Sequence, residues 1–335
     1  MEYRILGKTG LKVSRMGFGG IPIQRIDAAG TKALMRKVRD AGFNYIDTAR
    51  GYSVSESYLG EALEGIRQDF VLATKSMSRT RDAMAADIDI SLANLRTDYI
   101  DLYQIHNPSP EQLDQVIAPG GALEALLEAK QAGKIGHIGI SIHSPEVFRR
   151  ALELPWVETL MFPYNIVESH GTDLIHACAE KNIGFIDMKP LAGGAIEDAT
   201  LAMRYVCANE DITVTIPGMA DPAELEQNLA AVNDTAPLSE EEIQKMESIR
   251  KALGTQFCRR CNYCAPCTVG INIPNVFIFE GYVSRYGLGE WAMGRYLAMP
   301  KQASDCIGCG VCESRCPYNL PIRAMLKKVA DKMGK

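Results

Sequence analysis

Four side chains capable of acid–base chemistry occur near the ends of three apolar, strand-like segments. Asp47 ends the first segment, and Tyr52 lies in the loop that follows it. Lys75 comes directly after the second segment, and His106 ends the third. A phenol with a pKa of about 10 can exchange protons at neutral pH only if a neighbouring cation favours its ionised form. These residues therefore predict a proton-donating site, provided that the fold brings them together.

Eight of the ten cysteines lie in two dense motifs near the end of the chain. The second motif has the spacing C-x2-C-x2-C-x3-C-P and contains Cys306, Cys309, Cys312 and Cys316. The first begins with the same spacing and contains Cys258, Cys261, Cys264 and Cys267, but its fourth cysteine comes one residue early and Thr268 replaces the proline. Three thiolates at this spacing can reach three irons of one cubane cluster. Zinc is the alternative metal, because C-x2-C pairs also bind zinc, but a run that ends in Cys-Pro favours iron.

The segments that must position the four acid–base residues follow a repeating pattern. Eight apolar runs are typical of strands: 16–19, 45–48, 70–74, 100–105, 135–141, 157–162, 184–188 and 213–216. Helical patterns lie between them, as in residues 83–95, and a short hairpin is predicted over residues 1–13. Eight strand–helix units over roughly 250 residues predict an α/β protein with a (β/α)8 TIM barrel. A doubly wound sheet is the alternative, but residues 17–20 match its glycine-rich turn only weakly.

In a barrel of this kind, the C-terminal ends of the strands carry the chemistry. Asp47, Lys75 and His106 would then end strands two, three and four, with Tyr52 in the loop after strand two. A single polar residue at such a place is most often a turn or capping residue. Four compatible residues at neighbouring strand ends make a catalytic site the stronger interpretation.

The chain of 335 residues is longer than one barrel requires, and its composition changes near residue 254. A long segment with few cysteines precedes a segment in which they are dense. A secreted disulfide scaffold would be short and would follow a signal sequence. We therefore predict a barrel domain over residues 1–254 and a small cysteine-rich domain over residues 255–335.

The charge and hydropathy pattern exclude two kinds of partner. The net charge is −5 without a basic stripe, which argues against nucleic acid. The N-terminus lacks an apolar signal core, and no apolar run approaches the ~20 residues of a membrane span. We expect a cytoplasmic protein that acts on a small molecule.

Residues 1 to about 250 resemble the aldo-keto reductases. The stretches RILGKTGLKVS, NYIDTARGYSVSESYLGEAL, FVLATK and DLYQIH follow one another in that family's order. The resemblance implies NAD(P)H-dependent reduction of a carbonyl, or the reverse oxidation of an alcohol, with Tyr52 as general acid. It also implies that Lys75 lowers the pKa of the tyrosine, that Asp47 holds the lysine, and that His106 orients the carbonyl oxygen. Donors already aimed at that oxygen stabilise the negative charge that develops on it.

The cofactor side departs from the family at several positions. Ile142 follows Ser141 in place of an asparagine, Met161 replaces a glutamine, and Met188 replaces the aromatic residue that stacks on the nicotinamide. The stretch IPGMADPAELEQN preserves the adenosine side better. The cofactor contacts implied by the resemblance are Ser141, Leu191, Gly218, Glu224 and Asn228.

Two features of the adenosine side bear on the choice of cofactor. Gly218 and a helix start near Asp221 suit a diphosphate that lies on backbone N–H groups. Glu224 stands where NADP-using members carry arginine, and a carboxylate repels a 2′-phosphate. Our hypothesis is that NADH is preferred over NADPH if either binds.

The tail resembles a bacterial-type ferredoxin module with two [4Fe–4S] clusters. The length between its motifs and a helix predicted over residues 283–298 indicate the helical variety of this module. The favoured assignment gives one cluster to Cys258, Cys261, Cys264 and Cys316. The other cluster would be held by Cys267, Cys306, Cys309 and Cys312.

The two halves handle electrons differently, because nicotinamide passes a hydride and a [4Fe–4S] cluster passes one electron at a time. In one hypothesis the barrel is a nicotinamide-dependent reductase and the tail is a structural, sensory or docking module. In a second, a flavin or the substrate occupies the altered pocket, and the clusters deliver electrons from a redox partner protein. In a third, the chain is a non-catalytic electron-transfer or redox-sensing adaptor. The four retained proton-handling residues favour an enzyme, and the first hypothesis ranks slightly above the second.

Overall fold

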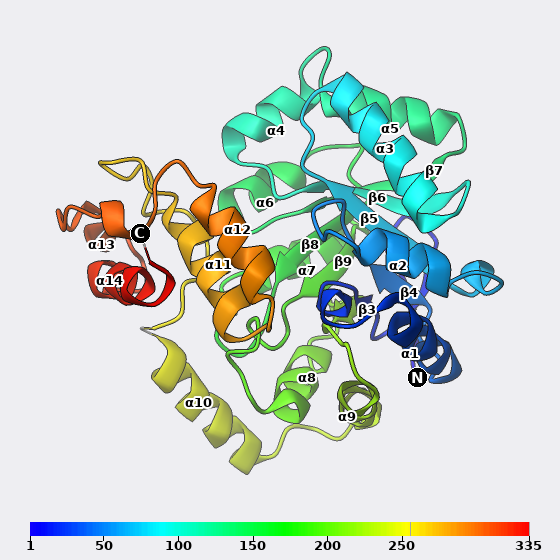
Figure 1. Ribbon diagram of the computed structural model, residues 1–335. Coiled ribbons are helices and arrows are strands. Elements are labelled where there is room, and N and C mark those ends of the chain that lie inside the picture. The colour runs from blue at the N-terminus through cyan, green and yellow to red at the C-terminus, as the bar shows by residue number, and fades with distance from the viewer. Residues whose placement is uncertain (255, 335) are drawn as a thin grey trace. The chain divides into compact units, whose positions relative to one another are not determined.

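The computed structural model describes residues 1–254 and 256–334. The chain forms two compact units, coloured along the chain in Figure 1. Unit 1 consists of Met1–Leu191 and Asp198–Leu238, and unit 2 of Ala192–Glu197 and the residues from Ser239 onward. The predicted domain boundary at 254/255 touches Thr255, which lies outside the described residues.

Unit 1 is built on eight parallel strands, each paired with the next one along the chain. They are β3 (Phe18–Gly19), β4 (Tyr45–Asp47), β5 (Val71–Ser76), β6 (Ile100–His106), β7 (Ile135–Ser141), β8 (Thr159–Pro163), β9 (Gly184–Met188) and β10 (Val214–Ile216). All eight predicted strands are present, and their ends differ from the prediction by at most two residues. Most of their residues are buried because helices cover the outside and side chains fill the inside of such a sheet.

Backbone contacts between the first and last strands close the sheet into a barrel. The amide of Gly17 donates to the carbonyl of Thr215 at 2.8 Å, and the amide of Gly19 donates to that of Pro217 at 2.9 Å. The β3 strand has only two residues, and these bonds extend its pairing beyond them. The structure is therefore a (β/α)8 barrel, as predicted.

Helices connect successive strands, and capping residues mark where several of them begin. They are α1 (Ala28–Asp40), α2 (Ser55–Ala62), α3 (Arg81–Leu95), α4 (Pro110–Ile117), α5 (Ala122–Gln131), α6 (Pro145–Ala151), α7 (Thr172–Glu180), α8 (Ala199–Cys207) and α9 (Pro222–Asn233). Ser109 forms a capping box with Gln112 at the start of α4. Proline occupies the first turn of α4, α6 and α9, where its missing N–H has no intrahelical acceptor.

An N-terminal hairpin, β1 (Tyr3–Ile5) and β2 (Lys12–Ser14), contributes to the core inside the barrel. Its Leu6 and Val13 are fully buried in a cluster with side chains from the strands. Gly7 adopts a φ of +52°, and a Cβ atom there would lie 2.2 Å from the backbone nitrogen of Gly184. Only glycine permits this close approach. The hairpin thereby fixes one end of the barrel and leaves the strand ends of the candidate site at the other.

In its described part, unit 2 contains helices and no strand. The helices are α10 (Glu240–Gly254), α11 (Ile273–Ser284), α12 (Gly289–Leu297), α13 (Val311–Ser314) and α14 (Ile322–Met333). A core shared by α11 to α14 joins aliphatic residues such as Val276 and Leu326 to Cys264 and Cys312. This unit therefore builds its core around its cysteines.

The single helix predicted over residues 283–298 is wrong. The α11 helix ends at Ser284, and α12 begins at Gly289. Gly287 lies between them with a φ of +65°, a left-handed conformation that interrupts a right-handed helix. No helix within residues 1–254 and 256–334 has the length and apolar character needed to cross a membrane.

Candidate functional site

A buried ion pair lies at the centre of the barrel site. Lys75 on β5 is 1% exposed, and its Nζ donates to Oδ1 of Asp47 on β4 and, at 2.8 Å, to the carbonyl of Thr48. The other carboxylate oxygen of Asp47 accepts from Nε2 of Gln104 at 3.1 Å. Burial lowers the pKa of Lys75, and the carboxylate of Asp47 partly offsets this effect. Protein groups rather than water therefore supply these hydrogen-bond partners of the two buried charges.

Tyr52 and His106 complete the predicted group. The Nζ of Lys75 lies 5.0 Å from the centre of the Tyr52 ring. The rings of Tyr52 and His106 are 6.0 Å apart and meet edge to face at 87°. The structure therefore brings together all four residues that the sequence singled out, from β4, β5, β6 and the loop after β4.

The loop that carries Tyr52 is held by a buried carboxylate. Glu56 is 1% exposed; its oxygens accept from Thr74 and Ser91 hydroxyls, each at 2.8 Å, and from Arg50 at 2.8 Å. Arg50 also pairs with Asp87 at 3.4 Å. Because these partners come from β5 and α3, the network ties the loop to rigid elements on both sides.

His106 is an uncharged imidazole in this environment. Burial lowers its pKa well below the ordinary value of 6.5, and the nearby cations Lys75, Arg79 and Lys189 lower it further. Its Nδ1 atom is buried without a hydrogen-bond partner in the described protein. A neutral ring can donate an N–H to a ligand oxygen without giving up a proton at pH 7.

The positions predicted to lie near the nicotinamide hold one polar side chain, Ser141, and two apolar ones, Met161 and Met188. Ser141 on β7 pairs in register with His106 on one side and Met161 on the other. Its hydroxyl is fully buried and has no partner within the described residues, so a ligand amide could satisfy it. Met161 and Met188 are buried in the barrel's interior cluster.

The residues expected near the adenosine differ in what they offer. The Oδ1 of Asn228 is buried without a protein partner in the described chain, whereas Leu191 packs at the edge of the outer core. Glu224 accepts from the backbone amide of Ala220 at 2.7 Å and pairs with Arg25 at 3.5 Å. Gly218 is exposed, and a Cβ there would lie 2.7 Å from Pro22.

The start of α9 differs from the sequence expectation. The carboxylate of Asp221 accepts from the amides of Ala223 at 2.6 Å and Glu224 at 3.3 Å. Together with the Glu224–Ala220 bond, these contacts satisfy amide groups that were expected to bind a diphosphate. A diphosphate contact at this helix remains a prediction.

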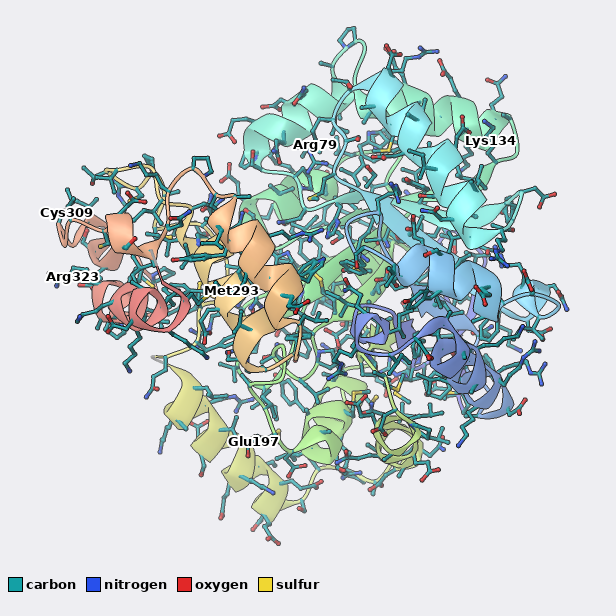
Figure 2. All side chains as sticks on the ribbon, viewed as in Figure 1. Arg79, Lys134, Glu197, Met293, Cys309 and Arg323 are labelled. Carbon is teal, nitrogen blue, oxygen red and sulfur yellow. The ribbon has the colours of Figure 1, made fainter. Side chains whose placement is uncertain are left out.

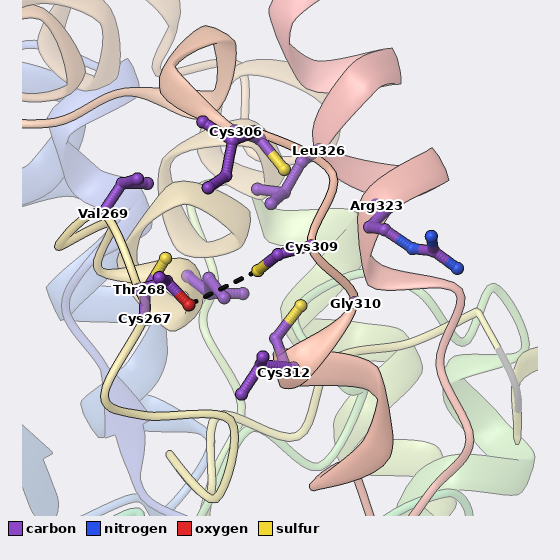
Figure 3. A pocket seen from close by; sticks show the side chains of 12 residues that line it. Cys267, Thr268, Val269, Cys306, Cys309, Gly310, Cys312, Arg323 and Leu326 are labelled. Carbon is purple, nitrogen blue, oxygen red and sulfur yellow. Dashed lines mark hydrogen bonds between the residues drawn. The ribbon is translucent and has the colours of Figure 1, made fainter.

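Unit 2 brings four cysteines around one hollow. Cys267, Cys306, Cys309 and Cys312 line one hollow that is partly open to solvent. Figure 3 shows their sulfur atoms turned toward the same space. Within residues 1–254 and 256–334, no three His, Cys, Asp or Glu side chains converge on a point suited to a single metal ion. A cubane instead distributes its ligands over separate irons, and the four-cysteine hollow fits that requirement.

The remaining four cysteines also influence one another. Burial and the neighbouring thiols of Cys258 and Cys261 raise the pKa of Cys264 to about 12. Burial also raises the pKa of Cys261, and Cys316 contributes to the shift. Cys312 also raises the pKa of Cys264, so these couplings show that Cys258, Cys261, Cys264 and Cys316 lie near one another but do not by themselves separate the two sets.

The two cysteine motifs share one backbone conformation. Gly308 and Gly310 in the second motif have φ values of +72° and +78°. The corresponding residues of the first motif, Arg260 and Asn262, have φ values of +59° and +67°. Side chains other than glycine are strained in this region, so the first motif reaches the same turn at an energetic cost. The two motifs therefore share left-handed residues at corresponding positions.

The sequence did not identify several residues of these sites. Gln104 precedes His106 by two residues on β6, and the alternation of side chains along a strand was the signal that could have found it. Glu56 is a carboxylate at the start of α2, where an exposed role would have been the usual expectation. The hydroxyl of Thr268 lies 3.4 Å from the sulfur of Cys309, as the dashed line in Figure 3 marks.

The family follows from the comparison with known proteins. The model of the Aldo/keto reductase family matches residues 15–201, and that of a 4Fe-4S dicluster domain matches residues 257–321. The chain belongs to the aldo/keto reductase family and carries a C-terminal 4Fe-4S dicluster domain. Both resemblances drawn from the sequence are confirmed.

Relatives cover the barrel almost completely. L-galactose dehydrogenase of Arabidopsis thaliana is 28% identical and covers 74% of this chain and 94% of its own length. Aldo-keto reductase YhdN of Bacillus subtilis is 29% identical over 71% of this chain and 76% of its own. Among solved structures, the holo form of aldo-keto reductase AKR11C1 from Bacillus halodurans has a TM-score of 0.64 at 27% identity, covering 74% of this chain and 96% of that one. The chain is therefore an oxidoreductase.

A pH titration tests the electrostatics of this site. We expect the His106 ring to stay neutral well below pH 6.5, because burial and three cations disfavour its charged form. The exposed His176, beside Asp211, should titrate above 6.5 and serves as the internal control. NMR of the ring signals, assigned with His106→Gln, measures both.

The lowered pKa of His106 also predicts how the stability of the fold depends on pH. A histidine whose folded pKa is depressed takes up its proton preferentially in the unfolded state, so stability is lost as pH falls below about 6.5. Removing the ring in His106→Gln should flatten this loss. A His106 signal that titrates at or above 6.5 would contradict the expected environment.

Proposed function

We propose that unit 1 reduces the carbonyl group of a small molecule, or oxidises the corresponding alcohol, with NAD(P)H as cofactor and Tyr52 as general acid. One observation carries this proposal: the buried ammonium of Lys75, held by Asp47, lies 5.0 Å from the Tyr52 ring, which in turn contacts His106. No other role accounts as well for a buried cation beside a phenol at the barrel's strand ends.

The proton follows a short path in this proposal. As negative charge develops on the carbonyl oxygen, the hydroxyl of Tyr52 gives that oxygen its proton. Lys75 stabilises the phenolate that remains, and solvent returns the proton afterwards. Neutral His106 donates an N–H to the same oxygen, which fixes the carbonyl and shares the charge.

The other residues hold this group in place. Asp47 balances the ammonium of Lys75, and Gln104 fixes the carboxylate. The buried polar atoms of Ser141 and Asn228, which lack protein partners in the described chain, support a bound nicotinamide nucleotide. When bound, the reduced nicotinamide supplies the hydride.

Replacing the proposed acid should separate catalysis from structure. Tyr52→Phe should lower carbonyl reduction by roughly 10²–10⁴-fold, because a positioned general acid contributes about that factor. Tyr3→Phe removes a hairpin hydroxyl that donates to the carbonyl of Gly42 after α1, and the turnover of this variant should not change. Steady-state kinetics with a panel of aldehydes measures both variants. Turnover in Tyr52→Phe equal to that of the parent protein would reject the assigned role.

Cofactor choice is a separate prediction. We expect NADH to bind roughly tenfold more tightly than NADPH, since the Glu224 carboxylate would repel a 2′-phosphate, an effect that its pairing with Arg25 reduces. Glu224→Gln should reduce this preference. Titration by fluorescence quenching gives both dissociation constants, and tighter binding of NADPH by the parent protein would refute the preference.

We propose that unit 2 holds two [4Fe–4S] clusters with the crossed ligand sets predicted from the sequence. The four-cysteine hollow supports one set, and the coupling among Cys258, Cys261, Cys264 and Cys316 supports the other. Such clusters, when bound, pass single electrons. The surface exposure of Cys309 favours exchange with a redox partner protein.

Metal analysis of paired variants tests the crossed assignment. Anaerobically purified protein should contain about eight irons and as much acid-labile sulfide per chain. Cys309→Ser and Cys267→Ser should each lose about half of the iron, and their combination should lose no more, because both would serve one cluster. Cys267→Ser with Cys258→Ser should lose nearly all of it.

Cys207→Ser, which alters a cysteine on α8 outside both motifs, is the matched control and should retain all iron. Zinc in place of iron would exclude the clusters. Additive losses for Cys267 and Cys309 would reject the crossed sets.

A second candidate function has one observation in its favour. Met161 and Met188 are buried where the family's glutamine and aromatic residue would contact nicotinamide. An apolar wall of this kind is compatible with a flavin, which could divide a two-electron reaction between the substrate and the clusters. Resolved flavin bands in the visible spectrum of the purified protein would favour this function over the first.

A further inference from the structure

Arg79 is a half-buried cation that the proposed mechanism does not use. It lies in the loop after β5, beside α4, and is labelled in Figure 2. The backbone of this loop is fixed: the carbonyl of Arg79 accepts from Ala122 at 3.0 Å, and Arg81 donates to Gly120 at 2.8 Å. The guanidinium is therefore carried by a rigid segment rather than by a mobile one.

The guanidinium lies against the catalytic group. Its Nη2 donates to the carbonyl of His106 at 2.7 Å and to the side chain of Gln112 at 3.3 Å. Its Nε is buried and has no acceptor among the described residues. Burial lowers the pKa of Arg79 to about 10, which leaves it charged at neutral pH.

No carboxylate within residues 1–254 and 256–334 forms an ion pair with Arg79. Three other arginines of the barrel are paired: Arg50 with Glu56, Arg67 with Asp101 and Arg204 with Asp234. Arg15, which is 2% exposed, has no carboxylate partner in the described chain either, but it lies away from the strand ends and donates to the carbonyls of Cys207 and Asn209. A buried charge without a counter-ion is costly, and a donor left without an acceptor adds to that cost. An anion bound at this place would remove both penalties.

The charges around His106 also favour an anion. Lys75, Arg79 and Lys189 all act on its ring, and no carboxylate is among the groups that do. Asp47 pairs with Lys75. Arg79 thus adds a positive charge beside His106 that no carboxylate pairs within the described residues, and such a charge attracts anions.

We propose that Arg79 binds an anionic group, a carboxylate or a phosphate, on the carbonyl substrate. This inference rests on the proposed function and names the substrate class: aldehydes or ketones that also carry an acidic group. Nη2 already donates to two acceptors, so the donors left for an anion are Nε, which has no acceptor among the described residues, and Nη1, which makes one long bond of 3.5 Å to the carbonyl of Ser78.

Anion binding can be measured apart from catalysis. Calorimetry with succinate and with inorganic phosphate, in the parent protein and in Tyr52→Phe, should give the same affinity for both proteins. Arg79→Gln should weaken the preferred anion by roughly 10- to 100-fold, the range expected for lost hydrogen bonds to a charged group. The preferred anion distinguishes a carboxylate-bearing substrate from a phosphate-bearing one.

Two further variants make the result specific to the guanidinium. Arg81→Gln removes an exposed arginine two residues away, paired with Glu128, and should bind the anion like the parent protein. Arg79→Lys keeps the charge but loses the planar fork, so it should fall between the parent and Arg79→Gln. Anion affinity that is equal in Arg79→Gln and in the parent, or no anion binding in the parent, would overturn the proposal.

Kinetics then connect the anion site to the reaction. The parent protein should prefer 4-oxobutanoate to butanal in kcat/KM, and Arg79→Gln should lose that preference mainly through KM, because the contact is made in both ground and transition states. An equal preference in both proteins would overturn the inference. Arg79-dependent anion binding without any carbonyl reduction would instead reject the proposed function and leave the anion site standing.

Discussion

The ion pair between Lys75 and Asp47 is the interaction on which the polar interior of the barrel depends. An ammonium enclosed by strands costs several kcal/mol in lost hydration unless a carboxylate and further hydrogen bonds replace the water. Asp47, Thr48 and Gln104 supply those partners from β4, the loop after it, and β6. Removing one member of such a pair typically costs about 3–5 kcal/mol, because the other charge stays buried. Stability and acid–base chemistry therefore draw on the same contact.

Much of this arrangement could be predicted from the sequence, for a physical reason. The strands of a barrel are buried on both faces, so a run of apolar residues that ends in Asp47 or His106 marks where a strand reaches the open end. Parallel strands then bring those ends together. The cysteines were predictable in the same way, because ligand spacing along a loop is a local property.

Partners that depend on register or tertiary packing could not be predicted. The pairing of Gln104 with Asp47 joins residues two strands apart in the sheet, and only the register across β5 decides it. The break between α11 and α12 depends on a left-handed Gly287, whose neighbours follow a helical pattern on both sides. At the start of α9, the carboxylate of Asp221 accepts from the amides of the helix itself. The sequence does not show whether such amides bind the capping side chain or a ligand.

The division of the chain has a consequence for how the two units can be separated by proteolysis. The polypeptide passes from one unit to the other three times, after Leu191, after Glu197 and after Leu238, since Ala192–Glu197 belongs to unit 2 although it connects β9 to α8. The eight motif cysteines nevertheless lie in one continuous stretch, residues 258–316, which is part of the second segment of unit 2. A cut in the chain between Leu238 and Cys258 would therefore leave every predicted metal ligand on one fragment, while the short segment Ala192–Glu197 would stay with the barrel.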